Sequence, residues 1–165
     1  MPSLAIVGAG PQLDLAIARD VLEYSPAGSL DSAPPTTPTA TRPSSVESET
    51  NLRLYGAVPA TQAVLPAMRQ AGAGTLLYTS GAGSVRPVPR AAHAGAAAAA
   101  LRNWAVNLHK VLADSGIQAA HITLDVTIGM SSFYGRPTAT ADQISPLYWD
   151  LHTTHRDEAE RIFRG

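Results

Sequence analysis

The residues of this chain best suited to binding chemistry are two glycines near its N-terminus. Gly8 and Gly10 stand in the run Gly-Ala-Gly-Pro-Gln-Leu-Asp, between a short apolar segment and a helical pattern. Glycines in such a turn let the backbone bend tightly and approach a pyrophosphate, whose charge rests on the helix N-terminus. Asp14 falls in the first turn of that helix, where its carboxylate would repel a phosphate. Two interpretations stay open: a nucleotide site, and a structural turn that binds no cofactor.

Histidines are the other residues that could do chemistry. His93 can act as a general acid or base because imidazole titrates near neutral pH; the alternative is that it packs at the start of a helix. His152 and His155 have i, i+3 spacing, but a metal site needs further ligands of fixed geometry. We therefore expect a solvated polar face there and no metal site. The chain has no cysteine, and so no thiolate nucleophile and no disulfide.

Apolar runs alternate with helical patterns along the chain. The apolar runs predict three buried parallel strands, over Leu4–Val7, Thr75–Thr79 and Ile117–Leu124. The helical patterns predict four helices, over Leu13–Tyr24, Leu54–Gln70, Arg90–Ser115 and Ala141–Phe163. Pro66 predicts a kink or a late break in the second helix, and Gly116 is expected to follow the end of the third. The order predicts an α/β fold, a reduced Rossmann-like (doubly wound) parallel sheet of about three strands with flanking helices.

Residues 25–50 have a different composition from the rest. Proline, serine and threonine dominate this segment, and large apolar residues are almost absent. Such a segment buries too little surface to offset its ordering entropy, which predicts a mobile linker or surface loop. A structureless loop of this length is unusual inside a compact domain, so we interpret it as a replacement for missing βα units. The length of 165 residues otherwise predicts one domain, residues 1–165.

Two stretches resemble the short-chain dehydrogenase/reductase (SDR) family. Residues 4–19 look like the family's opening strand, turn and helix, and residues 57–129 are similar to its second half. The resemblance implies oxidoreductase ancestry and an NAD(P)-binding fold, with Ile128 and Gly129 in the loop that meets the nicotinamide side of the cofactor. The strand that the family places beside Thr75–Thr79 has no candidate here. Either the first strand takes its place or a partner chain completes the sheet.

The family's catalytic positions lack the family's catalytic residues. The segment 99–105 resembles the one that follows the family's Lys, which puts Lys at Ala98, Tyr at Ala94 and Ser at Gly81. The family's helix Asn would fall at Arg53. Alanine and glycine side chains cannot transfer a proton, so hydride transfer by the usual mechanism is not expected. In this sense the chain resembles a truncated pseudoenzyme.

A register shifted by one residue would pair Ser80 with His93 at the family's Ser–Tyr spacing. Three functions therefore stay open. The first is a degenerate SDR-like protein that acts as a non-redox binding or scaffold protein. The second is a repurposed non-redox enzyme, an isomerase, cyclase or dehydratase acting on an apolar metabolite, with Ser80 and His93, together with His121, doing the acid–base work. The third is a residual NAD(P)-dependent oxidoreductase, so the cofactor expectation is either none or NAD(P).

Composition bounds the partners. The formal net charge of −1, with scattered Lys and Arg, gives no electrostatic footprint for nucleic acid. We therefore expect no nucleic-acid partner. No run of the sequence reaches the length of an apolar membrane span, so we expect no membrane partner and a cytoplasmic location. The SDR resemblance implies a homodimer or higher oligomer, packed through residues 54–68 and 91–105. A small apolar ligand is the other expected partner.

Overall fold

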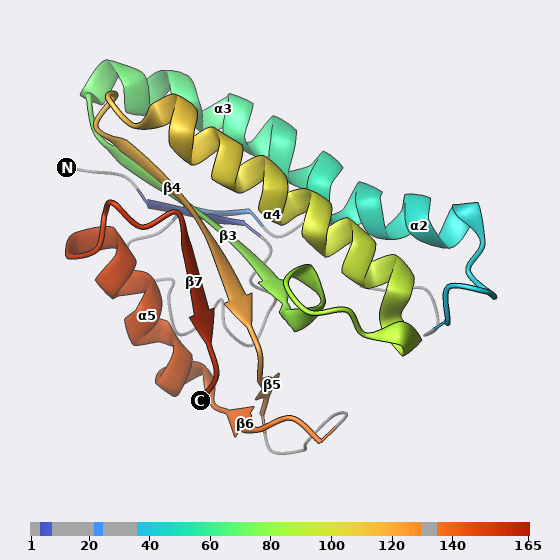
Figure 1. The fold of residues 1–165 in the computed structure, drawn as a ribbon. Coiled ribbons are helices and arrows are strands. Elements are labelled where there is room, and N and C mark those ends of the chain that lie inside the picture. Colours follow the sequence, from blue (N-terminus) through green and yellow to red (C-terminus); the bar gives the residue numbers. More distant parts are fainter. Residues whose placement is uncertain (1–3, 8–21, 25–35, 130–134) are drawn as a thin grey trace.

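A parallel β-sheet forms the centre of the molecule. The computed structural model describes residues 4–7, 22–24, 36–129 and 135–165 (Figure 1). Five described strands lie in the order β2-β1-β3-β4-β7, all parallel. They are β1 (Leu4–Val7), β2 (Leu22–Tyr24), β3 (Gly74–Gly81), β4 (Ile117–Leu124) and β7 (Glu160–Phe163).

The predicted parallel sheet with flanking helices is confirmed, with five described strands where about three were expected. The predicted strands β1, β3 and β4 are all present, and β1 pairs directly with β3, so that Ala5 lies opposite Leu76. The first strand thus takes the place for which no candidate strand could be found in the sequence. The additional strands are β2 and β7, and both occupy segments that the helical pattern had assigned to helix ends. The remainder of the first predicted helix, residues 13–21, lies outside the described residues.

The prediction that residues 25–50 form a linker is wrong for its last third. Residues 25–35 lie outside the described part, but helix α2 spans Pro43–Thr50 and begins with proline in its first turn. It runs without a break through a π-helical turn, η1 (Asn51–Tyr55), into α3 (Gly56–Ala71). This continuity, together with packing of α2 against α4 (Ala92–Leu112), stabilises a segment whose composition is poor in apolar residues.

The helices cover both faces of the sheet. Figure 1 shows α2, α3 and α4 on one face and α5 (Ala141–Thr153) on the other. Helix α3 continues through Pro66 to Ala71, later than the break that proline predicts. Gly72 follows it in the left-handed conformation (φ 62°), and Gly116 after α4 is also left-handed (φ 73°). The glycine predicted to follow the end of α4 therefore has the backbone conformation typical of that role.

Alternating side chains of β3 and β4 build two cores. Leu76 and Tyr78 point toward α3 and α4, whereas Leu77 and Ile122 point toward α5. Both strands are buried on both faces, as parallel strands covered by helices must be. This double coverage holds the carboxyl ends of β3 and β4 in fixed positions, and the candidate functional site lies at the end of β3.

The last predicted helix ends ten residues earlier than the pattern indicated. Helix α5 begins as predicted, with Thr140 and Gln143 in a reciprocal capping box, and ends at Thr153. Residues Glu160–Phe163 form strand β7, and Phe163 packs against the core below α5. These residues form a strand because they pair with the edge of β4. If they continued the helix instead, the backbone N–H and C=O groups at that edge of β4 would lack this strand partner.

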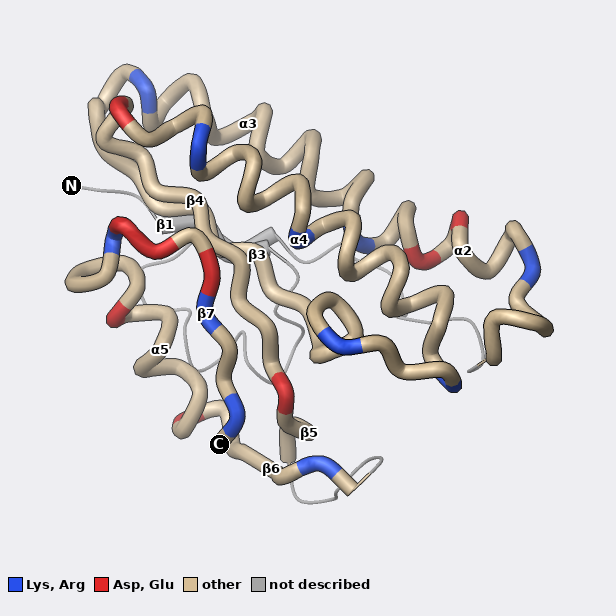
Figure 2. Tube along the Cα trace, in the orientation of Figure 1, with Lys and Arg blue, Asp and Glu red and all other residues tan. Residues whose placement is uncertain are grey.

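Basic and acidic residues are interspersed along the described trace (Figure 2). In the described part, the helices are all too short or too polar to cross a membrane.

Candidate functional site

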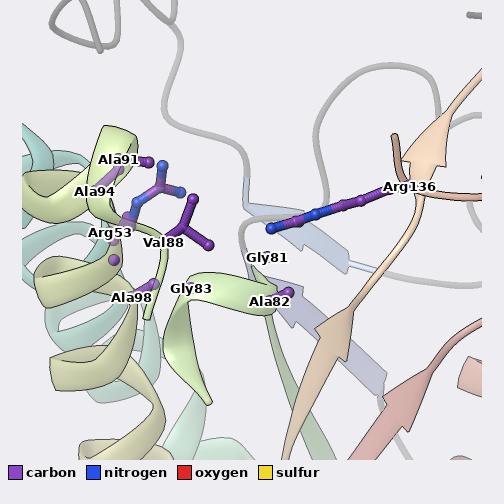
Figure 3. Close-up of a pocket in the computed structure, with 10 residues that line it drawn as sticks. Arg53, Gly81, Ala82, Gly83, Val88, Ala91, Ala94, Ala98 and Arg136 are labelled. Carbon is purple, nitrogen blue, oxygen red and sulfur yellow. The ribbon is translucent and has the colours of Figure 1, made fainter. Parts of the chain in front are cut away.

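A pocket of about 170 Å³ lies between the carboxyl end of β3 and the first turns of α4 (Figure 3). Gly81, Ala94 and Ala98 all line it. These are the positions that the sequence register assigned to the family's Ser, Tyr and Lys, so the structure brings them together. The other described lining residues are Arg53, Ala82, Gly83, Val88, Ala91, Gly95 and Arg136.

Close backbone packing shapes one wall of the pocket. After β3 the chain forms a 3₁₀ turn, η2 (Ala82–Ser84), that lies against the start of α4. A Cβ atom added to Gly83 would come within 3.1 Å of the Cα of Gly95. Glycine at both positions therefore lets the loop and the helix approach more closely than larger residues would allow. A Cβ atom at Gly81 would meet open space instead.

Two arginines enter the pocket from different elements. Arg53 comes from the π-helical turn η1, and Arg136 comes from the segment before β6 (Thr138–Ala139). Figure 3 shows Arg136 extended toward Gly81, while Arg53 lies near Val88 and Ala91. Arg53 is also the residue that the register placed at the family's Asn position. Sequence analysis missed Arg136, because nothing in the spacing of a loop arginine indicates where it folds back.

Each arginine has a carboxylate outside the described lining. Arg53 donates from Nε to Glu49 Oε2 at 3.2 Å, and its Nη2 lies 2.9 Å from the same oxygen. The Glu49 side chain is fully buried, and its other oxygen has no hydrogen-bond partner among the described residues. Arg136 Nε lies 3.9 Å from Asp125 Oδ1, and Arg86 Nη2 donates to both oxygens of Asp125 at 2.7 Å. A single carboxylate, that of Asp125, thus serves two guanidinium groups.

The described lining of the pocket holds no side chain that exchanges a proton near neutral pH. Of its described residues only the arginines are ionisable, and a guanidinium remains protonated throughout the physiological range. The remaining described lining consists of glycine, alanine and valine. What this arrangement offers instead is positive charge beside a small apolar surface.

The predicted pair Ser80 and His93 has separate hydrogen-bond partners. Ser80 Oγ lies 2.9 Å from His121 Nε2, whereas His93 Nδ1 lies 3.1 Å from Thr36 Oγ1. Both Ser80 and His93 are buried, and the described lining of the pocket includes neither. His121 also approaches Thr123, with 3.4 Å between Nδ1 and Oγ1. Ser80 therefore belongs to a buried polar chain under α4.

Burial, with a smaller contribution from the charge of Arg102, lowers the pKa of His121 to about 4. At neutral pH the imidazole is uncharged in the folded protein, and it is a weak base compared with an ordinary histidine. The residue thus serves as a neutral hydrogen-bonding group between Ser80 and Thr123.

This pKa predicts a loss of stability in acid. Between about pH 6.5 and about pH 4, the unfolded chain binds a proton at His121 that the folded protein does not. The stabilisation is complete above pH 6.5 and disappears as the pH falls to about 4, with a contribution of roughly 3 kcal/mol. Urea unfolding of the wild type and of His121→Gln across this range should show the shallower decline in the variant. An NMR titration of His121 in the intact protein with a midpoint near pH 6.5 would contradict the assignment.

The predicted cofactor-binding residues are placed as follows. Gly8 and Gly10 lie outside the described residues. Ile128 is in β5 (Thr127–Ile128), and its side chain packs against the core below α5. The N–H of Gly129 donates to the carbonyl of Ala139 at 3.0 Å, across the β5–β6 pair. That donor is therefore already used within the protein, and the described residues do not by themselves form a nicotinamide site.

Comparison with known proteins identifies the architecture. The sequence matches no family model and no curated protein. The structure superposes on an SDR-family oxidoreductase from Burkholderia thailandensis with a TM-score of 0.73 and 15% identity, covering 98% of this chain and 90% of that one. L-Sorbose reductase from Gluconobacter frateurii, solved with NADPH and L-sorbose, gives a TM-score of 0.79 at 13% identity and covers 99% of this chain and 95% of that one. The chain has the SDR fold.

Within the SDR fold, similarity extends over almost the whole chain. A gluconate 5-dehydrogenase from Burkholderia cenocepacia J2315, solved with NADP and tartrate, gives a TM-score of 0.76 at 14% identity, covering 99% of this chain and 94% of that one. The resemblance seen in the sequence is thus confirmed at the level of fold. At these identities, activity has to be argued from the pocket itself.

Proposed function

We propose that this protein is a non-redox binding protein built on the SDR fold. The observation that carries the proposal is the convergence of Gly81, Ala94 and Ala98 on one pocket. That convergence supports the register in which the family's Ser, Tyr and Lys are replaced. Hydride transfer to a carbonyl needs a group that delivers a proton to the oxygen, and the described lining has none.

The test is a search for turnover. Purified protein is mixed with NADH or NADPH and a panel of aldehydes and ketones, and absorbance of the reduced cofactor is followed. We expect no consumption above that of a buffer blank, because the described lining has no side chain that gives up a proton near neutral pH. Consumption that depends on the protein and on the carbonyl would overturn the proposal.

A titration of NADH and NADPH by calorimetry accompanies this assay. Binding without turnover would agree with the proposal and would make a dinucleotide one of the ligands. Absence of NADH and NADPH binding would also agree with the proposal, and would mean that the ligand is not a dinucleotide.

Gly81→Ser serves as a structural control for the register. The backbone at Gly81 has φ −83°, which any residue adopts, and the new side chain would meet open space. We expect stability to change by less than about 0.5 kcal/mol in thermal unfolding, as for other substitutions without a clash. A loss of several kcal/mol would show that this position does not face the cavity.

A second candidate function is acid–base chemistry by Ser80 and His121, favoured by their 2.9 Å contact. The lowered pKa of His121 and the burial of both side chains favour a structural role instead. The proposal for this pair is tested by His121→Gln: if turnover of an apolar metabolite is found, the variant should lose it.

A further inference from the structure

We propose that the emptied catalytic pocket binds a short monocarboxylate, with the carboxylate held by Arg53 and Arg136. The inference rests on the proposed function, because it takes the pocket to be a binding site rather than a centre of hydride transfer. It adds the chemical class of the ligand.

The charge of the described lining favours an anion. Both ionisable residues of that lining are arginines, and two carboxylates that contact them, Glu49 and Asp125, are not part of it. The cavity side therefore presents guanidinium groups. An arginine can donate to a second acceptor while it holds the first, since its planar fork carries five N–H donors.

The carboxylates hold the guanidinium groups in place. Glu49 contacts Arg53 through two nitrogens, so the side chain is oriented before a ligand arrives. Asp125 is fixed by two hydrogen bonds from Arg86 and lies beside Arg136. Preorganised donors bind more tightly because less side-chain entropy is lost on binding.

The rest of the lining decides between an inorganic anion and an organic one. Its remaining described residues, among them Ala91, Ala94 and Ala98, offer apolar surface and no hydroxyl group. Phosphate has several oxygens that would be left without donors against these walls, which is costly. A carboxylate with a short hydrocarbon chain matches both surfaces. The volume of about 170 Å³ is enough for a carboxylate with a chain of a few carbon atoms.

The experiment compares three probes on the full-length protein by ligand-observed NMR titration. Butyrate carries the charge and the apolar chain, butyramide is its neutral isostere, and inorganic phosphate carries charge alone. We expect butyrate to bind at least about tenfold more tightly than butyramide, as for the loss of one charge-assisted hydrogen bond. We expect phosphate to bind more weakly than butyrate. Equal binding of butyrate and butyramide, or no binding of butyrate, would overturn the inference.

The variants locate the site. Glu49→Gln with Arg53→Gln removes the ion pair as a unit, so that no buried carboxylate is left unpaired. Arg136→Gln removes the other guanidinium. Each should weaken butyrate binding about tenfold or more, whereas Arg90→Gln, an exposed arginine outside the described lining, should leave it unchanged. If one variant fails to fold, as judged by circular dichroism, the other still decides. An equal loss in Arg90→Gln would contradict the inference.

The outcomes separate the two proposals. Carbonyl-dependent NADPH consumption would reject the non-redox function whether or not butyrate binds. Absence of butyrate binding, with no turnover, would reject only the ligand class.

Discussion

Replacing Gly116 with alanine is expected to destabilise the protein by about 3 kcal/mol or more. Gly116 has φ 73°, and a Cβ atom there would lie 2.2 Å from the carbonyl oxygen of Gly72. The left-handed conformation alone costs an alanine about 1–2 kcal/mol. The clash adds to this cost because its partner is backbone and cannot rotate away. Urea unfolding followed by circular dichroism measures the change.

Gly72→Ala is the matched control. Gly72 is also left-handed (φ 62°), but a Cβ atom there would meet nothing within 4 Å. We therefore expect only the conformational cost of about 1–2 kcal/mol. The difference between the two variants measures the contact between the ends of α3 and α4. Equal destabilisation would show that the two turns do not touch as the structure places them.

Arg53→Ala is expected to cost about 3 kcal/mol of folding stability. The substitution leaves the Glu49 carboxylate buried under α4 without its cation. An uncompensated buried charge is far more costly than the loss of the ion pair as a whole. Thermal and urea unfolding near neutral pH should both show the loss.

The double variant that combines Glu49→Gln with Arg53→Ala should recover most of that stability, since the buried charge is removed with its partner. The exposed Arg69, on α3, offers a comparison: Arg69→Ala should change stability by less than about 0.5 kcal/mol. If the double variant is as unstable as Arg53→Ala alone, the cost arises from lost packing of the arginine and not from the buried carboxylate.

The sequence was informative wherever burial and short-range spacing act together. Strand β4 was predicted with its observed bounds, Ile117–Leu124, because an apolar run with a glycine before it has few other structures open to it. The positions of Gly81, Ala94 and Ala98 followed from the resemblance. That they face one cavity depends on the strand–loop–helix geometry that the SDR fold imposes on any sequence.

Long-range pairing determined what the sequence could not indicate. Helix α2 has the composition of a linker, and packing on α4 stabilises it. Residues 160–163 have a sequence pattern that predicts a helix, but they form strand β7 because they pair with the edge of β4. Arg136 reaches the pocket from a loop, where no periodicity acts. In each case the deciding partner is distant in the sequence.

The direct pairing of β1 with β3 indicates how a parallel sheet can accommodate the deletion of a strand and its helix. In a parallel ladder all strands point the same way, so removing a whole strand-plus-helix module preserves the polarity of those that remain. Losing half a module would reverse every later strand. Domains of this kind can therefore be shortened by whole strand–helix units, after which the strands on either side of the removed one pair directly with each other.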